Sequence, residues 1–311
     1  MGDIGRVGLV GTGVIGAGWA ARFLHHGIDV VATDPAPGAE AMLHEMLANA
    51  AAALNKLPTG VAAGRLEFSD DLERAVAEVD FIQESAPERE DLKRDLLARI
   101  SRAARPGAII ASSSSGLLPS RLQADCVGPE RVLIGHPFNP VYLLPLVEVV
   151  GGKRTSAEAL GRAEAFYGAI GMHPLRVRRE IEGYISDRLQ EALWREALHL
   201  VNDGIATTEE IDRAIVHGPG LRWAFLGACL GFHLAGGAGG MRHTLEQFGP
   251  ALQLPWTRLA APELTNALAD RLIAGTEAQA GGRSVRELER QRDDCLIAIM
   301  RAIEDAGAVQ A

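Results

Sequence analysis

The chain has 311 residues, of which 47% are hydrophobic and 23% charged, a balance typical of a soluble globular protein. Its length favours two domains, each large enough to bury a core of its own. The net charge of −9, from 31 Lys and Arg against 40 Asp and Glu, argues against nucleic acid or an anionic membrane as a partner.

Cysteine usage and the N-terminal segment indicate the cellular compartment. Cys126, Cys229 and Cys295 lie far apart and form no CxxC pair, which favours reduced thiols and gives no sign of a metal site. The N-terminus runs straight into a strand pattern at 6–10, without the basic and apolar segments of a secretory signal. No apolar run approaches the roughly 20 residues that span a bilayer. We therefore expect a cytoplasmic protein with no membrane segment.

Up to about residue 180, short apolar runs alternate with stretches of helical periodicity. The apolar runs are interpreted as buried parallel strands at 7–10, 29–33, 81–84, 108–112 and 132–134, with 146–150 and 175–178 extending the same sheet. Helices are predicted at 15–26, 39–55 and 88–103. This alternation predicts a doubly wound α/β domain with helices on both faces of its sheet.

After Gly183 the strand signals stop and helical spacing takes over. Apolar residues from 185 to 201 recur at intervals of three and four, which predicts a long amphipathic helix. Thr207, followed three residues later by Glu210, fits a capping box at the start of the next helix. Further helices are predicted at 221–234, 240–248, 263–279 and 284–304, with glycine-rich breaks at 236–240 and 281–282. The predicted domains are therefore 1–181, which is α/β, and 182–311, which is all-helical.

A glycine-rich turn follows the first predicted strand and opens the first helix. Its residues are Gly11, Thr12, Gly13, Val14, Ile15 and Gly16. The first glycine permits the tight turn, the second lets a pyrophosphate approach the backbone, and the third allows close packing of helix on strand. Asp34 ends the second strand, where a carboxylate accepts hydrogen bonds from the adenosine ribose and repels a 2′-phosphate. These residues predict a Rossmann-type domain with NAD, rather than NADP, as the cofactor.

A histidine and a glutamate mark the candidate site of the chemistry. His136 lies in the motif Gly-His-Pro-Phe-Asn-Pro at 135–140, and Glu148 follows within the next apolar run. Doubly wound sheets bind ligands near the carboxyl ends of their strands. Alcohol oxidation needs a base that titrates near neutral pH and a carboxylate that fixes its tautomer. Spacing alone leaves two interpretations open, a catalytic pair or a histidine with a structural role.

These motifs, taken in order, resemble the 3-hydroxyacyl-CoA dehydrogenase family. The resemblance covers about residues 5–250 and rests on the fingerprint, the serine run 112–115, the histidine motif with its glutamate, and the helix after residue 183. It implies that His136 is the general base and that Glu148 orients it. It also implies that Ser115 binds the reacting oxygen while hydride leaves C3 of a 3-hydroxy substrate for the nicotinamide.

The resemblance extends to the cofactor and to assembly. It implies that Glu88, Lys93 and Asn139 line the bound NAD. Members of the family are usually dimers through the helical domain, and we expect a homodimer here. The implied partner is a small-molecule substrate.

One position departs from the family pattern. Asp187 stands where the acyl-CoA enzymes have an Asn that holds the substrate oxygen, and a carboxylate cannot donate the hydrogen bonds of an amide. Asp187 either takes part in the chemistry of a different substrate or pairs with an arginine such as Arg188. The segment 35–64, rich in lysines in the acyl-CoA enzymes, contains only Lys56 and no Arg. Both features argue against a CoA thioester.

Within the family, four stretches resemble the branch that oxidises L-carnitine, a 3-hydroxy acid with a trimethylammonium group: 135–152, 191–197, 220–224 and 239–256. Aromatic faces and negative charge bind quaternary ammonium, each contact contributing roughly 0.5–2 kcal/mol. The candidate contacts are Tyr142, Tyr184, Trp194 and Trp223, with Asp187 for the charge and Arg222 for the substrate carboxylate. Each of these side chains fits a core or interface position equally well.

Three other functions stay open at this point. The same catalytic residues would serve another small 3-hydroxy acid such as L-gulonate, or a short-chain 3-hydroxyacyl-CoA. Crystallin-like members of the family are structural proteins, and the intact set of Ser115, His136 and Glu148 argues against that role. Measuring NADH formation from the candidate substrates would separate these functions.

Overall fold

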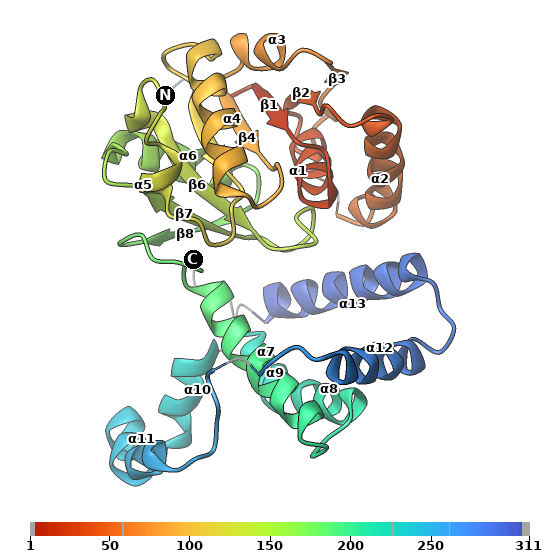
Figure 1. The fold of residues 1–311 in the computed structure, drawn as a ribbon, viewed down its shortest axis with the longest axis vertical. Coiled ribbons are helices and arrows are strands. Elements are labelled where there is room, and N and C mark those ends of the chain that lie inside the picture. The colour runs from red at the N-terminus through yellow and green to blue at the C-terminus, as the bar shows by residue number, and fades with distance from the viewer. Residues whose placement is uncertain (1–3, 58, 226, 261, 307–311) are drawn as a thin grey trace. The chain divides into compact units, whose positions relative to one another are not determined.

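A computed structural model describes residues 4–57, 59–225, 227–260 and 262–306 (Figure 1). The chain divides into two compact units, Met1–Asp187 and Arg188–Ala311. The first unit is α/β and the second is helical, as the sequence predicts. The division after residue 181 stays a proposal about where the domains separate.

The first unit is built on a sheet of eight strands in the order β3-β2-β1-β4-β5-β6-β7-β8. The strands are β1 Arg6–Val10, β2 Asp29–Thr33, β3 Leu66–Phe68, β4 Phe81–Glu84, β5 Ile109–Ser112, β6 Val132–Pro137, β7 Leu146–Gly151 and β8 His173–Val177. Neighbouring strands are parallel except β6 and β7, which are antiparallel. The chain runs outward from β1 in both directions, so the switch point of this doubly wound sheet lies between β1 and β4.

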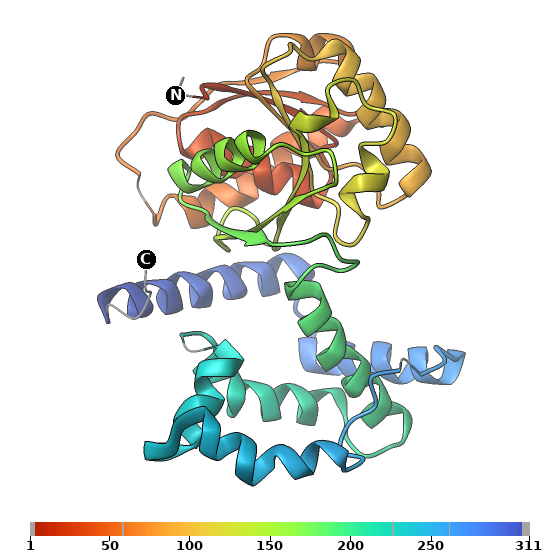
Figure 2. The same cartoon turned by 90° about the vertical axis from the view of Figure 1, so that its left-hand side faces the viewer.

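Helices cover both faces of the sheet because side chains alternate along each buried strand. Val7 and Leu9 of β1 pack with α1 Val14–His25, α2 Ala39–Leu54 and α6 Ala157–Ala169. Val10 packs on the other face with α3 Leu72–Ala77, α4 Glu90–Ala103 and α5 Pro119–Leu122. Helices α1 and α6, red and green in Figure 2, lie together on one face. The predicted fold class is confirmed.

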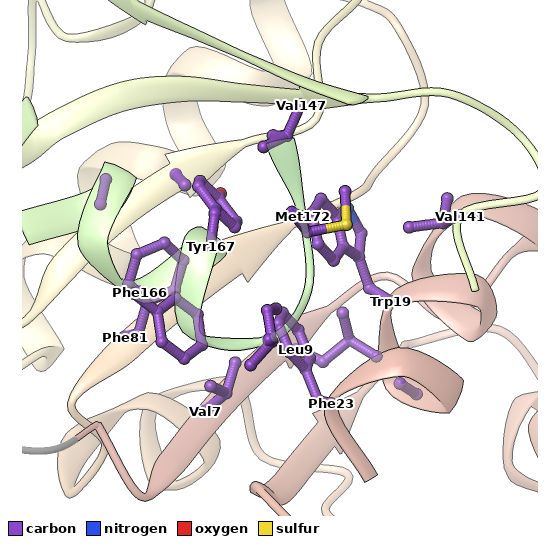
Figure 3. Packing of buried hydrophobic residues seen from close by; sticks show 14 of the residues in the cluster. Val7, Leu9, Trp19, Phe23, Phe81, Val141, Val147, Phe166, Tyr167 and Met172 are labelled. Atoms are coloured by element: carbon purple, nitrogen blue, oxygen red, sulfur yellow. The ribbon is translucent and has the colours of Figure 1, made fainter. Parts of the chain in front are cut away.

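A cluster of buried aromatic rings joins α1 and α6 to the sheet (Figure 3). Trp19 stacks on Phe23 with ring centroids 5.2 Å apart and on Tyr167 at 5.4 Å. Phe166 approaches Phe81 of β4, with centroids 4.6 Å apart. Each such pair adds about 0.5–1.5 kcal/mol beyond area burial. The rings therefore fix both helices against the strands that carry the candidate site.

The second unit consists of helices and short 3₁₀ turns. The helices are α7 Ser186–Asn202, which crosses the unit boundary, α8 Thr208–Val216, α9 Pro219–Trp223, α10 Gly227–Ala235, α11 Gly240–Phe248, α12 Asn266–Ala280 and α13 Val285–Asp305. The capping box predicted at Thr207 and Glu210 is present, and Ser284 forms a second one with Glu287. In the described ranges, no helix has the length and apolar character needed to cross a bilayer.

Several sequence predictions of elements are incomplete or wrong. The helix predicted at 221–234 is two helices, α9 and α10, because Gly227 has a φ of +67°, a left-handed conformation that breaks a helix. Residue 226, between them, lies outside the described residues. Strand β3 and helices α3, α5 and α6 were not predicted.

Candidate active site

The glycine-rich turn between β1 and α1 is shaped by close backbone contacts. Gly11 has a φ of +90°, and a Cβ there would lie 2.8 Å from the carbonyl oxygen of Ser85. A Cβ on Gly16 would overlap the carbonyl oxygen of Gly11, so the helix packs onto the turn only with glycine at that position. Gly13, in contrast, faces open space, with nothing within 4 Å of an added Cβ. The turn is therefore closed behind Gly11 and Gly16 and open at Gly13, as a cradle for a diphosphate must be.

Polar groups around this cradle suit a dinucleotide. No side chain caps the N-terminus of α1, so the N–H groups of its first turn, at Val14 and Ile15, can face a phosphate. Asp34 directly follows β2, and its Oδ2 accepts hydrogen bonds from the Thr12 N–H at 2.8 Å and the Thr12 hydroxyl at 3.2 Å. Its Oδ1 accepts from Ala36 N–H at 2.9 Å. The carboxylate is thus fixed beside the turn, where an adenosine ribose would lie.

His136 and Glu148 form a cross-strand pair. They are register partners in the antiparallel pair β6/β7, and His136 Nδ1 lies 3.0 Å from Glu148 Oε2. Glu148 is completely buried, and the imidazole is nearly so. Burial by itself would raise the pKa of the Glu148 carboxyl, but hydrogen bonds from His136 and from the Ser186 and Ile185 N–H groups outweigh it and lower the pKa. An ionised Glu148 keeps a proton on Nδ1 and leaves Nε2 with a free lone pair.

The second oxygen of Glu148 holds the start of α7. Its Oε1 accepts hydrogen bonds from the N–H groups of Ile185 and Ser186, both at 3.0 Å. This places Asp187 over the imidazole, with Asp187 Oδ2 3.7 Å from His136 Nε2. Tyr184 packs beside the same ring, with centroids 5.5 Å apart. The imidazole therefore lies between two carboxylates, one at each ring nitrogen.

Glu88 organises the loop that carries Ser115. Its Oε1 accepts hydrogen bonds from the Ser114 hydroxyl, the Ser115 N–H at 2.9 Å and the Gly116 N–H at 3.2 Å. Ser115 itself is exposed, at the carboxyl edge of the sheet beyond β5. Its backbone is therefore fixed while its hydroxyl remains accessible to a ligand.

A buried ion pair lies beneath this loop. Lys93 Nζ donates to Glu84 at 2.9 and 3.1 Å, and both side chains are buried. Glu84 also accepts from the Ser112 hydroxyl, and Lys93 Nζ lies 3.7 Å from Glu88 Oε2. Lys93 thus links the end of β4 to the carboxylate that holds the Ser115 loop.

Family models match both units in chain order. The NAD-binding domain of 3-hydroxyacyl-CoA dehydrogenase matches residues 6–181, and the C-terminal domain of the same enzyme matches residues 183–283. The chain belongs to the 3-hydroxyacyl-CoA dehydrogenase family. It is an NAD-dependent dehydrogenase, which excludes a purely structural, crystallin-like role.

Similar proteins cover nearly the whole chain of this dehydrogenase. L-carnitine dehydrogenase from Pseudomonas aeruginosa is 62% identical over 98% of this chain and 96% of its own. The enzyme of that name from Bacillus cereus is 59% identical over 97% of this chain and 93% of its own. Among solved structures, 5-formyl-3-hydroxy-2-methylpyridine 4-carboxylic acid 5-dehydrogenase has a TM-score of 0.81 at 26% identity, covering 97% of this chain and 99% of that one.

The other residues that the sequence predicts for the site are distributed over both units. Asn139 is exposed just after β6. Tyr142 packs against a small cluster between α1 and α2, and Tyr184 is completely buried, with its hydroxyl donating to the Leu117 carbonyl at 2.8 Å. Exposed positions of the helical unit hold three candidates: Trp194 on α7, and Arg222 and Trp223 on α9.

Sequence reasoning missed a set of polar residues beneath the site. Gln83, Glu84 and Ser113 are fully or largely buried and hydrogen-bonded around the ends of β4 and β5. A signal existed, because Gln83 and Glu84 are polar residues within a strand predicted to be buried on both faces. Buried polar groups need hydrogen-bond partners, so the sequence alone indicates that Gln83 and Glu84 belong to a hydrogen-bond network.

Proposed function

We propose that this dehydrogenase oxidises the 3-hydroxyl of L-carnitine to 3-dehydrocarnitine, with His136 as the general base. The observation that carries the proposal is the imidazole held between Glu148 and Asp187. A base at a reacting hydroxyl with a carboxylate beside it suits an alcohol whose neighbouring group is a cation. The names of the relatives point to the same substrate.

Each side chain has a separate task in the proposed chemistry. Glu148 accepts a hydrogen bond from the Nδ1–H group of His136, so Nε2 is free to take the proton of the 3-hydroxyl. The Ser115 hydroxyl, on the loop held by Glu88, donates to the same substrate oxygen. Glu148 then stabilises the imidazolium that forms. Bound NAD supplies the acceptor for the hydride that leaves C3.

The residues proposed to hold NAD are those around the glycine turn. The backbone of Gly11–Gly16 faces the diphosphate, and Asp34 accepts from the adenosine ribose while repelling a 2′-phosphate. Glu88 and Asn139 line the nicotinamide side, and Lys93 acts there through the carboxylates it holds. Asp34→Ala is therefore expected to erode the preference for NAD over NADP, measured as the ratio of kcat/KM values. Equal use of both cofactors by the wild type would contradict this placement.

Asp187 is the proposed partner of the trimethylammonium group. In carnitine the ammonium nitrogen is two bonds from C3, so it lies within roughly 6 Å of any atom hydrogen-bonded to the 3-hydroxyl. Asp187 Oδ2 is 3.7 Å from the nitrogen that would make that hydrogen bond. Tyr184, Trp194 and Trp223 are proposed as aromatic neighbours of the cation, and Arg222 as the partner of the substrate carboxylate.

Substrate identity is tested by comparing NADH formation from L-carnitine, L-gulonate and 3-hydroxybutyryl-CoA under the same conditions. We expect kcat/KM for L-carnitine to exceed the other two by at least about two powers of ten, since a site for a quaternary ammonium leaves its carboxylate unpaired with a substrate that has no cationic group. Oxidation of L-gulonate or of the thioester in preference to carnitine would overturn the substrate and leave the dehydrogenase activity standing.

The role of Asp187 is tested by a cycle between protein and ligand. The analogue 3-hydroxy-5,5-dimethylhexanoate, which lacks the positive charge because carbon replaces nitrogen, should bind wild type far more weakly than carnitine does. Asp187→Asn should weaken carnitine while changing the analogue little, and the coupling between the two changes measures the charge interaction. If both ligands weaken equally, Asp187 has a structural role.

Assembly and location complete the proposal. Large apolar side chains are exposed on several helices of the second unit, including Leu230 and Phe232 of α10 and Leu245 of α11. Patches of this kind mark association surfaces, which supports a homodimer formed through the helical domain. The proposed place of action is the cytoplasm.

A further inference from the structure

Ser113 is the centre of a partly buried hydrogen-bond network that the proposed chemistry does not use. Its hydroxyl oxygen lies 3.1 Å from Trp19 Nε1, 2.8 Å from Gln83 Nε2 and 2.9 Å from the Ser85 hydroxyl. Tyr167 completes the network, donating to Gln83 Oε1 at 2.6 Å. Trp19 and Tyr167 stack against each other in the aromatic cluster (Figure 3), so the ring positions that set these contacts are fixed.

The direction of each hydrogen bond follows from what each group can donate. The indole N–H of Trp19 can only donate. Gln83 Nε2 faces the Gly135 carbonyl at 3.2 Å, and because a carbonyl can only accept, the amide nitrogen must be the atom on that side. Its other N–H therefore donates to Ser113.

Two donors fill both lone pairs of the Ser113 oxygen. Ser113 must then use its own proton as a donor, and Ser85 is the one remaining partner within the described part of this network. Ser85 consequently accepts from Ser113 and cannot return a proton to it. The hydroxyl proton of Ser85 is left to point elsewhere.

Ser85 lies at the switch point of the sheet. It directly follows β4, and its N–H donates to the Val10 carbonyl at the end of β1 at 2.7 Å. An added Cβ on Gly11 would touch the Ser85 backbone, and one on Gly16 would lie 3.5 Å from the Ser85 Cβ. The half-buried serine therefore borders the glycine turn on the β4 side of β1, and Asp34, which follows β2, lies on the other side.

We propose that Ser85 is a cofactor-binding residue whose hydroxyl donates to an acceptor oxygen of NAD, on the diphosphate or on the nicotinamide ribose. The network from Trp19 and Gln83 through Ser113 sets the direction of that donation before the cofactor arrives. The inference rests on the proposed placement of NAD over the glycine turn and is independent of the substrate. A preset donor binds more tightly than a freely rotating hydroxyl because less orientational freedom is lost.

Binding of NADH to the full-length protein, without substrate, tests the proposal by fluorescence titration. Ser85→Ala should raise the Kd for NADH roughly 3- to 10-fold, the effect of one hydrogen bond. The Kd for AMP should stay unchanged, because the adenosine half lies toward Asp34. A raised Kd for ADP would assign the contact to the diphosphate, and an unchanged one to the nicotinamide ribose. Ser101→Ala, which alters a buried serine of α4, is the matched control and should bind NADH as wild type does.

Trp19→Phe tests the direction of the network. The variant keeps a stacking ring but frees one lone pair on Ser113, so Ser85 can donate to Ser113 instead of to the cofactor. It should raise the Kd for NADH roughly 2- to 5-fold in the wild-type background and have no effect in Ser85→Ala. The proposal is overturned if Ser85→Ala changes the Kd for NADH less than about 2-fold, or weakens AMP as much as NADH. It is also overturned if the effect of Trp19→Phe persists in full without Ser85.

Discussion

The two units of the chain differ in how much of their apolar side-chain surface they bury. The α/β unit buries large side chains on both faces of its sheet, including Leu9, Trp19, Phe23 and Phe81, each fully inaccessible. In the helical unit, α8, α9 and α10 contain no buried residue among those described, and Trp256 and Leu252 are 70% and 80% exposed. The first unit closes its core within one chain, while the second presents apolar faces outward.

This contrast separates the two requirements of the proposed enzyme. The base, its orienting carboxylate, the serine loop and the cofactor turn all lie in the unit with the closed core, where packing holds them in place. The helical unit supplies exposed apolar helices whose burial calls for further surface. Substitutions in the first unit should therefore change catalysis, and substitutions in the second unit should change assembly.

The largest expected effect comes from the base. His136→Ala should lower kcat for carnitine oxidation by roughly two to four powers of ten, the usual contribution of a positioned general base, while the Kd for NAD barely changes. A variant with near-normal turnover would show that another residue takes the proton.

Breaking the buried ion pair of the first unit should lower the free energy of unfolding far more than breaking an exposed ion pair of the second unit. Lys93→Met leaves the carboxylate of Glu84 buried without its partner, so the free energy of unfolding should fall by about 3–5 kcal/mol. The double variant Lys93→Met/Glu84→Gln should recover much of the loss. Arg258→Met, which removes an exposed pair with Asp203 in the helical unit, should cost about 0–1 kcal/mol. Denaturant unfolding measures all three, and equal losses from Lys93→Met and Arg258→Met would contradict the contrast.

Strong local patterns made most of the fold predictable. A few neighbouring residues determine each of these features: the glycine turn, the buried strands β1, β2 and β4, and the capping box at Thr207. Helix α6, Ala157–Ala169, was missed because its alanines and glycines give little contrast between a buried and an exposed face. The short edge strand β3 is half-exposed and forms only by pairing with β2. Such elements depend on tertiary partners, which the sequence does not display.

The sequence likewise predicts some features of the candidate site and not others. His136 and Glu148 were recognisable from residue types and order, and the antiparallel register brings them together. The link between Glu148 and the start of α7, and the network around Ser113, join residues 28 to 94 positions apart in the chain. Hydrogen-bond partners at such separations follow from the packed sheet and have no local spacing to reveal them.

The oligomeric state tests whether the exposed apolar helices of the second unit form a dimer interface. If the exposed face of α10 lies in the dimer interface, Phe232→Glu should raise the dimer Kd at least about 30-fold, the effect of losing a buried aromatic anchor. Val127→Glu, at an exposed apolar residue of the first unit, should leave the dimer intact. Sedimentation velocity over a concentration series measures both. A monomeric wild type, or dissociation by Val127→Glu alone, would contradict the proposed interface.

The smallest expected effect is a pH dependence of stability from Glu148. Its pKa is lowered in the folded chain, so the ionised carboxylate stabilises the folded state. That contribution is complete above the ordinary pKa of glutamate, about 4.3, and is lost as the pH falls through the lower folded value. The difference in unfolding free energy between wild type and Glu148→Gln should therefore shrink as the pH is lowered from about 6 to about 3. A difference independent of pH would show that the ionised form contributes nothing.

The antiparallel register of β6 and β7 makes the distance between His136 and Glu148 a property of the sheet. A slip of one residue would turn the carboxylate to the other face, and a slip of two would move it by about 6.6 Å, beyond hydrogen-bond reach. Intermediate positions do not exist, because strands pair only in whole-residue steps. The register of this strand pair therefore decides whether the two side chains can meet at all.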